Sequence, residues 1–295
     1  MLKNAMSVSL LMDVILHQVV LIVTVQIKEK MGKYEDILSN LFGSGSIFVS
    51  NINCYNRNSI SVYSVNGKKV LLKEFKEKEF AEREKFFYKT LEDFCKIPKM
   101  YFEGDDFIII EFIESSNPDL ILAIRDWAKV HSNFIGSKFL TNPFFQKKKL
   151  RNLSDYVLSH KRTFGENTEK LGKNLLDQER EKDYITLIHG DLFGRNILTN
   201  NGNNYYIDFE FSGKGHPTSD LSLLLLNHPN MEEEIIKTYR ENISFDYEGI
   251  ESDINKELLR KGVQLIAGLG NLKMPSEGKK KIHKKFLDVI NAHCE

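Results

Sequence analysis

The chain has 295 residues, of which 41% are hydrophobic, so it is long enough to bury one large core or two smaller ones. Lysine plus arginine and aspartate plus glutamate number 41 each, so no net charge draws the protein to nucleic acid or to an anionic membrane. The three cysteines, Cys54, Cys95 and Cys294, lack the spacing of metal ligands and are typical of reduced thiols in a cytoplasmic protein.

Residues 1–30 contain a mostly apolar stretch, 8–27, which Asp13, His17 and Gln18 interrupt. Its longest clean apolar run, 19–23, is far shorter than the roughly 20 residues that a membrane-spanning helix needs. A secretory signal would end in a small-residue cleavage site, and none is evident. We interpret 1–30 as an extension upstream of Met31, with a membrane anchor as the alternative.

A small antiparallel sheet is predicted next. A short helix over 34–41 leads into strands at 47–51, 60–65 and 68–75, and Asn66-Gly67 favours a two-residue hairpin turn between the last two. Two more strands are expected at 98–102 and 107–113, on either side of the turn at 104–106.

Lys73 follows an apolar run in the third strand, and a lone strand lysine is usually an edge or solvent-facing residue. The helix predicted over 77–91, however, carries Glu84 within the apolar stripe of Phe80 and Leu91. A carboxylate in that position needs a partner, because burial of an unpaired charge is costly. Lys73 is the natural partner, so we predict a Lys73–Glu84 ion pair, with Glu77 and Glu82 as the alternatives if the helix phase differs.

Helices are predicted after the sheet. Pro118-Asp119 caps a helix with four residues on its buried side: Leu120, Ile124, Trp127 and His131. Amphipathic patterns also predict helices at 231–242, 254–268 and 278–292. Residues 134–184 fit neither the sheet nor these helices, and they carry a basic cluster at 147–151.

The most informative stretch of the chain is 187–226. His189, Asp191 and Asn196 form an H-x-D-x-x-x-x-N string, and Asp208 and Asp220 follow twelve and twenty-four residues after Asn196. These polar residues stand on short loops between apolar runs, which is where a rigid scaffold usually presents catalytic groups.

The spacing within this stretch predicts a phosphoryl-transfer site. Short strands are expected at 187–188, 197–198 and 205–207, and Asn201-Gly202 favours a type I′ turn that brings Asn196 close to Asp208. Amide and carboxylate oxygens suit Mg²⁺, which takes its other ligands from water and nucleotide phosphates. Asp191, before the hairpin, is predicted to face the acceptor hydroxyl.

This string, followed by I-D-F-E at 207–210, resembles the pattern H-G-D-x-x-x-x-N and I-D-[FW]-E of aminoglycoside phosphotransferase and choline kinase-like enzymes, which are relatives of protein kinases. The resemblance covers about forty residues, 187–226. It implies ATP and Mg²⁺ as cofactors, with Lys73 held by Glu84 at the α- and β-phosphates, Asn196 and Asp208 on the metal, and Asp191 as the catalytic residue.

The resemblance also implies roles for other residues. The stretch 107–115 resembles the strand and linker between the lobes, where main-chain groups of Glu111 and Ile113 would hydrogen-bond adenine. His189 would hold its loop as a buried structural residue, and Asp220 would anchor the same loop. Asp220 alone is equally compatible with a helix N-cap, which is also a structural role.

The sequence departs from protein kinases in two places. The loop 53–58 lies where kinases place the loop that covers the phosphates, but no glycine lies between Ile52 and Asn66. These residues are equally compatible with an ordinary solvent-exposed hairpin. Phe193 stands where protein kinases carry a lysine, and no A-P-E string follows Asp208, which favours a small-molecule acceptor.

The insert 134–184 would help to form the acceptor pocket, although its basic cluster is as well explained by a solvated helix face. The acidic region at 232–253 has two interpretations. Its carboxylates could bind a cationic acceptor near the cleft, or they could be charges at helix N-termini and in solvated loops.

We therefore predict an α+β, bilobal protein kinase-like fold. It has an N-terminal extension at 1–30, a nucleotide-binding lobe at 31–112 with an antiparallel sheet, and a mainly helical catalytic lobe at 113–295 that includes the insert. The predicted activity is transfer of the γ-phosphoryl group of ATP to a hydroxyl of a small molecule. The alternatives are a choline or ethanolamine kinase-like enzyme and a catalytically inactive nucleotide-binding scaffold.

Overall fold

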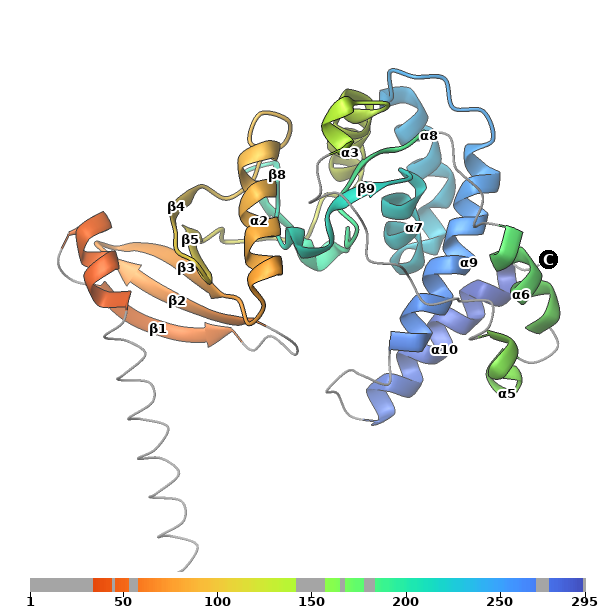
Figure 1. Ribbon diagram of the computed structural model, residues 1–295, viewed down its shortest axis with the longest axis horizontal. Helices are drawn as coiled ribbons and strands as arrows, with labels where there is room; N and C mark the ends of the chain where they lie inside the picture. Colours follow the sequence, from red (N-terminus) through yellow and green to blue (C-terminus); the bar gives the residue numbers. More distant parts are fainter. Residues whose placement is uncertain are drawn as a thin grey trace, which may run out of the picture.

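The computed structural model describes residues 34–43, 46–52, 58–141, 157–164, 168–177, 184–268 and 276–293. The predictions for residues 1–30, for the basic cluster at 147–151 and for all of the phosphate loop except Asn58 lie outside these ranges. Within them, a lobe built on one antiparallel sheet adjoins a mainly helical lobe (Figure 1). This arrangement confirms the predicted bilobal α+β fold.

The sheet of the first lobe has five antiparallel strands in the order β1-β2-β3-β5-β4. Their bounds are β1 Ser46–Ile52, β2 Ser59–Val65, β3 Lys68–Glu74, β4 Met100–Glu103 and β5 Phe107–Glu111. Asn66 and Gly67 both have positive φ, 51° and 76°, as a type I′ turn between β2 and β3 requires. All five strands lie within a few residues of the predicted ones.

Helices cover both faces of this sheet. Helix 34–42 packs on one face through Tyr34 and Leu38, which share a buried hydrophobic cluster with Val70 and Leu72 of β3. Helix α2, Lys78–Leu91, lies on the face turned toward the helical lobe (Figure 1). Because side chains alternate along a strand, Lys73 points to the face opposite Leu72, which is the face that α2 covers.

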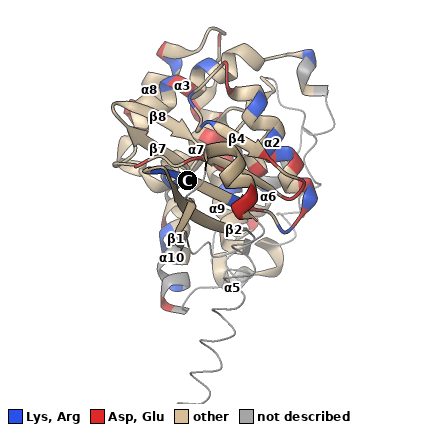
Figure 2. Ribbon diagram, turned by 90° about the vertical axis from the view of Figure 1, so that its left-hand side faces the viewer, with Lys and Arg blue, Asp and Glu red and all other residues tan. Residues whose placement is uncertain are grey.

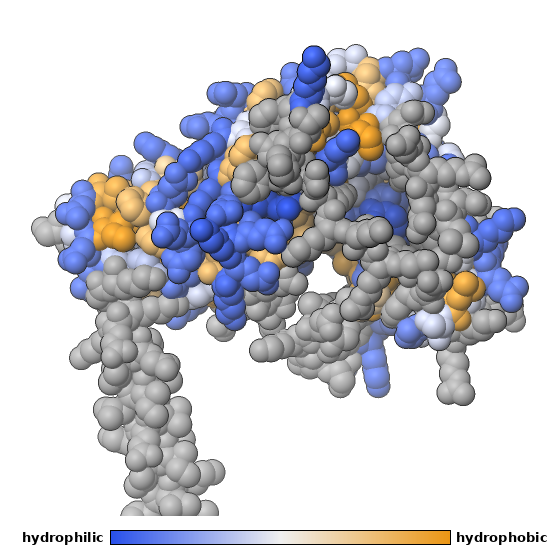
Figure 3. All heavy atoms as spheres, viewed as in Figure 1, coloured by the Kyte–Doolittle hydropathy of each residue, from blue (hydrophilic) through white to orange (hydrophobic). Residues whose placement is uncertain are grey.

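The outer side of α2 is hydrophilic (Figure 3), with lysines and glutamates side by side (Figure 2). Its exposed residues are Lys78, Glu79, Glu82 and Lys89. Glu82 pairs with Lys78 at 3.6 Å on this surface. Glu84 is instead buried, so the predicted helix phase is confirmed.

Helix α3, Leu120–Phe134, begins the helical lobe. The Asp119 carboxylate accepts a hydrogen bond from the Leu122 N–H at 2.9 Å, which confirms the predicted N-cap. Trp127, Ile124 and His131 are buried on the side that faces the rest of the lobe. Strand β5 ends at Glu111, two residues before the predicted end, because the chain there crosses from one lobe to the other.

Two small two-stranded sheets carry the loops of the 187–226 stretch. Strands β7 (Ile197–Asn200) and β8 (Asn203–Tyr206) form the predicted hairpin, and Asn201 and Gly202 have the positive φ of its type I′ turn. Strand β6 (Thr186–Ile188) pairs instead with β9 (Gly213–Gly215), which the sequence did not predict. Two of the three β9 residues are glycine, so its pairing depends on tertiary placement and not on strand propensity.

The remaining longer helices are α6 Thr168–Asp177, α7 Thr218–Asn227, α8 Glu232–Asn242, α9 Ile250–Gly268 and α10 Ser276–His293, and α5 spans Lys161–Phe164. The longer helices pack on one another and on α3, with α9 against α6, α7 and α10, and α8 against α3 and α7. Short 3-10 turns are η1 Lys138–Thr141, η4 Gly194–Asn196, η5 Phe209–Phe211 and η6 Pro229–Met231. In the described ranges, no helix combines the length and apolar character needed to cross a membrane.

Candidate active site

Lys73 of β3 and Glu84 of α2 form a buried ion pair within the first lobe. Lys73 Nζ lies 2.6 Å from Glu84 Oε2, and their side chains are only 6% and 1% exposed. The two predicted partners are therefore in contact. Nζ is 5.1 Å from the centroid of the Phe75 ring, so the ammonium also borders an aromatic face.

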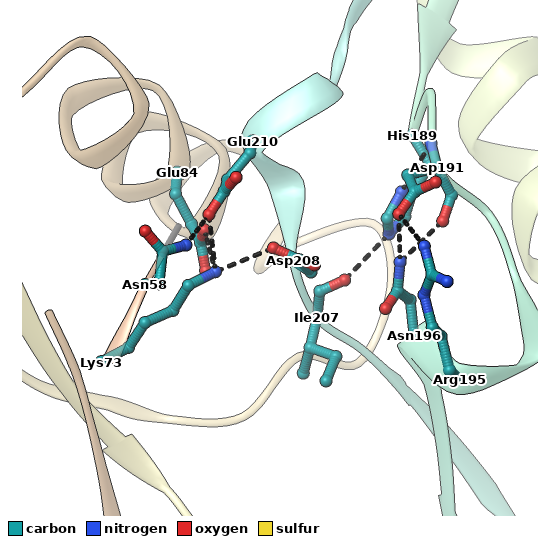
Figure 4. Close-up of polar contacts among 10 residues, drawn as sticks. All are labelled: Asn58, Lys73, Glu84, His189, Asp191, Arg195, Asn196, Ile207, Asp208 and Glu210. Atoms are coloured by element: carbon teal, nitrogen blue, oxygen red, sulfur yellow. Dashed lines mark hydrogen bonds and ion pairs between the residues drawn. The ribbon is translucent and has the colours of Figure 1, made fainter. Parts of the chain in front are cut away.

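The same lysine reaches the second lobe. Its Nζ lies 2.8 Å from Asp208 Oδ1 and 3.3 Å from Glu210 Oε1, so three carboxylates share one ammonium (Figure 4). Asp208 has left-handed backbone angles, φ 68° and ψ 60°, which turn its side chain out of the strand direction at the start of η5. Asp208 and Lys73 are 135 positions apart in the chain.

Glu210 was not among the predicted site residues. It is 5% exposed, and Asn58, just before β2, donates a hydrogen bond to its Oε1 (Figure 4). Glu210 is the last residue of the I-D-F-E string, but the spacing of that string does not indicate which residue Glu210 contacts. Asn58 and Glu210 join the edge of the predicted phosphate loop to the second lobe.

The charges in this cluster do not balance. Burial by itself would lower the pKa of Lys73, but Glu84, Asp208 and Glu210 raise it well above its usual value, so the ammonium stays protonated. Burial raises the pKa of Glu84 despite the attraction of Lys73. Burial also opposes ionisation of Asp208, yet Lys73 leaves its pKa below the ordinary value. One cation thus faces up to three carboxylates, which favours a further cation here.

His189 supports the loop 189–196 from inside the protein. Its ring is fully buried, and Nε2 lies 3.1 Å from the Ile207 carbonyl oxygen (Figure 4). A carbonyl only accepts, so Nε2 carries the proton and Nδ1 faces the Asp191 N–H at 3.4 Å. Burial lowers the pKa of His189, which keeps the ring neutral.

Asp220 fixes the backbone of the same loop. Its two carboxylate oxygens each accept a hydrogen bond at 2.8 Å, from the N–H groups of His189 and Gly190. His131 Nε2 lies 3.3 Å away, and its Nδ1 is 2.9 Å from the Tyr239 hydroxyl. Burial opposes ionisation, but the hydrogen bonds from His131 and the backbone hold the pKa of Asp220 below its usual value. Asp220 is the third residue of α7, so it is not the N-cap of that helix. Its hydrogen bonds instead anchor the loop.

Asp191 and Asn196 both belong to this loop, and hydrogen bonds join them. The Asn196 amide nitrogen donates to the Asp191 carbonyl at 2.8 Å and to Asp191 Oδ2 at 2.9 Å. Arg195 lies 3.1 Å from the same carboxylate oxygen, a contact that the sequence did not predict. The Asp191 side chain is 16% exposed, so it borders solvent while its position is held.

The Asn196 amide oxygen is turned to the side on which Asp208 lies (Figure 4), since its nitrogen is held by Asp191. The Asn196 carbonyl accepts from the Ile207 N–H at 3.1 Å, which ties the two ends of the hairpin together. Glu84, Asp208 and Glu210 also offer carboxylate oxygens within 4.8 Å of one another. Hard oxygen donors with excess negative charge fit Mg²⁺.

The predicted adenine contacts lie at the junction of the lobes. The Glu111 N–H donates to the carbonyl of Lys99, the residue before β4, at 2.8 Å, so this N–H already has a partner. The prediction of adenine hydrogen bonds therefore rests on the Glu111 carbonyl and on the main chain of Ile113, just past β5. A cavity of about 840 Å³ borders Glu111, the end of α2 and the β7–β8 turn. Its lining includes neither Lys73 nor Asp208, so we do not assign it to the nucleotide.

A lysine–glutamate pair in the sheet lobe, set against an aspartate that follows a hairpin of the helical lobe, is the arrangement of the protein kinase-like fold. Residues 120–251 match the phosphotransferase enzyme family. The predicted resemblance to aminoglycoside phosphotransferase and choline kinase-like enzymes is thereby confirmed.

One curated protein and several solved structures are similar to the chain. The LicA homolog of Mycoplasma capricolum subsp. capricolum is 27% identical over 172 residues, which are 57% of this chain and 70% of that protein. Choline kinase LicA from Streptococcus pneumoniae has a TM-score of 0.59 at 17% identity, covering 90% of this chain and 99% of its own.

Two antibiotic-modifying enzymes share the fold. A macrolide 2′-phosphotransferase from Brachybacterium faecium has a TM-score of 0.59 at 13% identity, with 89% of this chain and 98% of that chain covered. An aminoglycoside phosphotransferase in a ternary complex with ADP and hygromycin B has a TM-score of 0.61 at 14% identity, covering 88% and 97%. The TM-scores show a shared fold, and identities this low say nothing about the acceptor of this chain.

Proposed function

We propose that the protein is an ATP- and Mg²⁺-dependent phosphotransferase that moves the γ-phosphoryl group to a hydroxyl of a small molecule. The observation that carries the proposal is the buried Lys73, which joins Glu84 of one lobe to Asp208 of the other at 2.6 and 2.8 Å. Such a charge arrangement has no evident structural purpose, because buried ion pairs contribute little net stability. It suits the binding of a metal-bound triphosphate.

In the proposed reaction each residue has a limited task. Lys73, oriented by Glu84, binds the α- and β-phosphates, and Asn196 and Asp208 hold Mg²⁺, which neutralises phosphate charge when bound. Glu210 is a further carboxylate donor beside Asp208. Asp191 accepts the proton of the acceptor hydroxyl and orients its oxygen. His189 and Asp220 keep the loop 189–196 in place.

A choline or ethanolamine kinase-like activity is the second candidate. It is favoured by the 27% identity to a LicA homolog and by the fold similarity to a choline kinase. Transfer to an aminoglycoside or macrolide is supported by similarity of fold alone. A catalytically inactive scaffold is the third candidate, and it predicts ATP binding without turnover.

The test is Mg²⁺-dependent ATP turnover with a panel of aminoglycosides, macrolides, choline and ethanolamine. We expect one class to be phosphorylated, and Asp191→Asn to lower kcat about 10²–10³-fold with little change in ATP affinity. Arg195→Gln is the control, because it removes the exposed partner of Asp191 and leaves the carboxylate. Wild-type rates in Asp191→Asn would refute the assigned role, and ATP binding with no product from any acceptor would favour the scaffold.

A further inference from the structure

Lys261 of α9 is a buried lysine beside the loop 189–196 that the proposed chemistry does not use. It is 9% exposed, and its Nζ reaches the Gly190 carbonyl oxygen at 3.5 Å, the limit of a hydrogen bond. Within the ranges that the structure describes, no carboxylate lies within salt-bridge distance of this ammonium. A buried cation without a close anion is destabilising, so its presence needs another explanation.

The neighbouring Arg260 shows how the local acid is already used. Its guanidinium is held by both carboxylate oxygens of Glu257, with Nε at 2.7 Å from Oε2, and it lies 3.4 Å from the Ser219 hydroxyl. Glu257 therefore serves Arg260, and the Lys261 ammonium is directed to the loop. The two adjacent cations on α9 have different partners.

Gly190 is held from two sides. Asp220 accepts hydrogen bonds from the N–H groups of His189 and Gly190, while Lys261 donates to the Gly190 carbonyl. These three contacts fix three successive peptide units, and the third one leads directly into Asp191. The orientation of Asp191 therefore depends on the hold that Lys261 has on that last peptide.

The charge of Lys261 is sensitive to pH near neutrality. Burial and the charge of Arg260 lower the pKa of Lys261 to about 8, against the attraction of Glu257, Asp220 and Asp191. Glu257 and Arg260 face it from its own helix, Asp220 from α7 and Asp191 from the loop. At pH 7 the Lys261 side chain is mostly in its charged ammonium form. Above pH 8 it is mostly a neutral amine, which is a weaker hydrogen-bond donor.

We propose that Lys261 is a positioning residue for phosphoryl transfer, which holds the Gly190–Asp191 peptide by donating to its carbonyl and keeps a positive charge beside the Asp191 carboxylate. This inference rests on the proposed function of Asp191. Lys261 adds a second contact that holds the loop, besides the one from Asp220. Asp220 belongs to α7 and Lys261 to α9, so the packing of these two helices against each other fixes the loop.

The test uses the full chain and Mg²⁺-ATP with water as the acceptor, so it needs no identified substrate. Hydrolysis is measured from pH 6.5 to 9.5 for wild type, Lys261→Met, Lys261→Arg and Lys256→Met. Lys256 lies on the same helix with its side chain 52% exposed, so it is a matched control. Urea midpoints of all four proteins report folding separately.

We expect wild-type kcat to fall as the pH rises through about 8, because Lys261 loses its proton there. Lys261→Arg, which stays charged, should be flat to pH 9.5, and Lys261→Met should be flat and about tenfold slower, with KM for ATP within about twofold of wild type. Lys256→Met should keep the wild-type profile.

Two outcomes would overturn the inference. One is an unchanged kcat and pH profile in Lys261→Met; the other is an alkaline decline that persists in Lys261→Arg. The proposed function fails in a different way, which is the absence of any Mg²⁺-ATP turnover by wild type with water or with the acceptor panel, and the inference falls with it.

Discussion

At the scale of single residues, Lys73 is the group that joins acidic side chains of both lobes. Its ammonium touches Glu84, Asp208 and Glu210, and it is the one cation within salt-bridge distance of them in the described part of the chain. Two of these carboxylates are nearly inaccessible to water. Loss of the lysine should therefore affect both turnover and folding.

Lys73→Met is expected to lower kcat/KM for ATP about 10²–10³-fold, because the phosphates lose a preorganised cation. It should also destabilise the fold by about 3 kcal/mol, because Glu84 is left buried without its partner. Urea unfolding and steady-state kinetics measure the two effects.

The double variant Lys73→Met with Glu84→Gln separates these effects. It should recover most of the lost stability, since the unpaired carboxylate is gone, while activity stays low. Recovery of activity together with stability would mean that Lys73 acts only through folding.

At the scale of elements, the loop 189–196 is shaped by a close approach to η5. Gly190 has φ 80°, and a Cβ on it would lie 2.2 Å from the Phe211 carbonyl oxygen. Gly202, in the β7–β8 turn, has a similar φ of 72° with nothing within 4 Å. The two glycines thus differ in steric contact and share the same backbone requirement.

Gly190→Ala should destabilise the protein by clearly more than Gly202→Ala. The second substitution carries only the backbone strain of about 1 kcal/mol, whereas the first must also displace η5 and with it Asp208. Urea midpoints of the two variants test this difference. Equal midpoints would show that η5 moves freely, and the tight packing of the loop would then be without consequence.

At the scale of the whole molecule, stability depends on pH through buried groups such as His189. The folded pKa of His189 lies below its ordinary value of 6.5 because the ring is buried. The unfolded chain therefore binds a proton more readily, so the stabilisation is fully present above pH 6.5. It is lost progressively as the pH falls from there toward the folded pKa.

We expect the free energy of unfolding to decrease between pH 7.5 and 5.5, with His189 contributing at most about 1.4 kcal/mol per pH unit. His189→Gln keeps an N–H donor for the Ile207 carbonyl and does not titrate. Its stability should be lower throughout but should change less with pH. A pH dependence as steep as that of wild type would exclude His189 as a source.

Much of this structure follows from local sequence. Alternating and 3.6-residue patterns, Asn-Gly turns and the Asp119 cap specify elements through interactions between near neighbours. Glu84 was identified as the partner of Lys73 because helix phase places it on the apolar face. By contrast, β9 was missed because Gly213 and Gly215 have no strand propensity and pair only with β6 already in place.

The sequence by itself determined which polar groups stand on which local elements, since these follow from spacing over a few residues. Only the tertiary structure decided which of them meet: Asp208 and Glu210 at Lys73, His131 at Asp220, and Lys261 at Gly190. These partners lie between about 70 and 140 positions apart, where no periodicity links them. Their contacts arise because the packing of the helices and the closure of one lobe on the other bury them together.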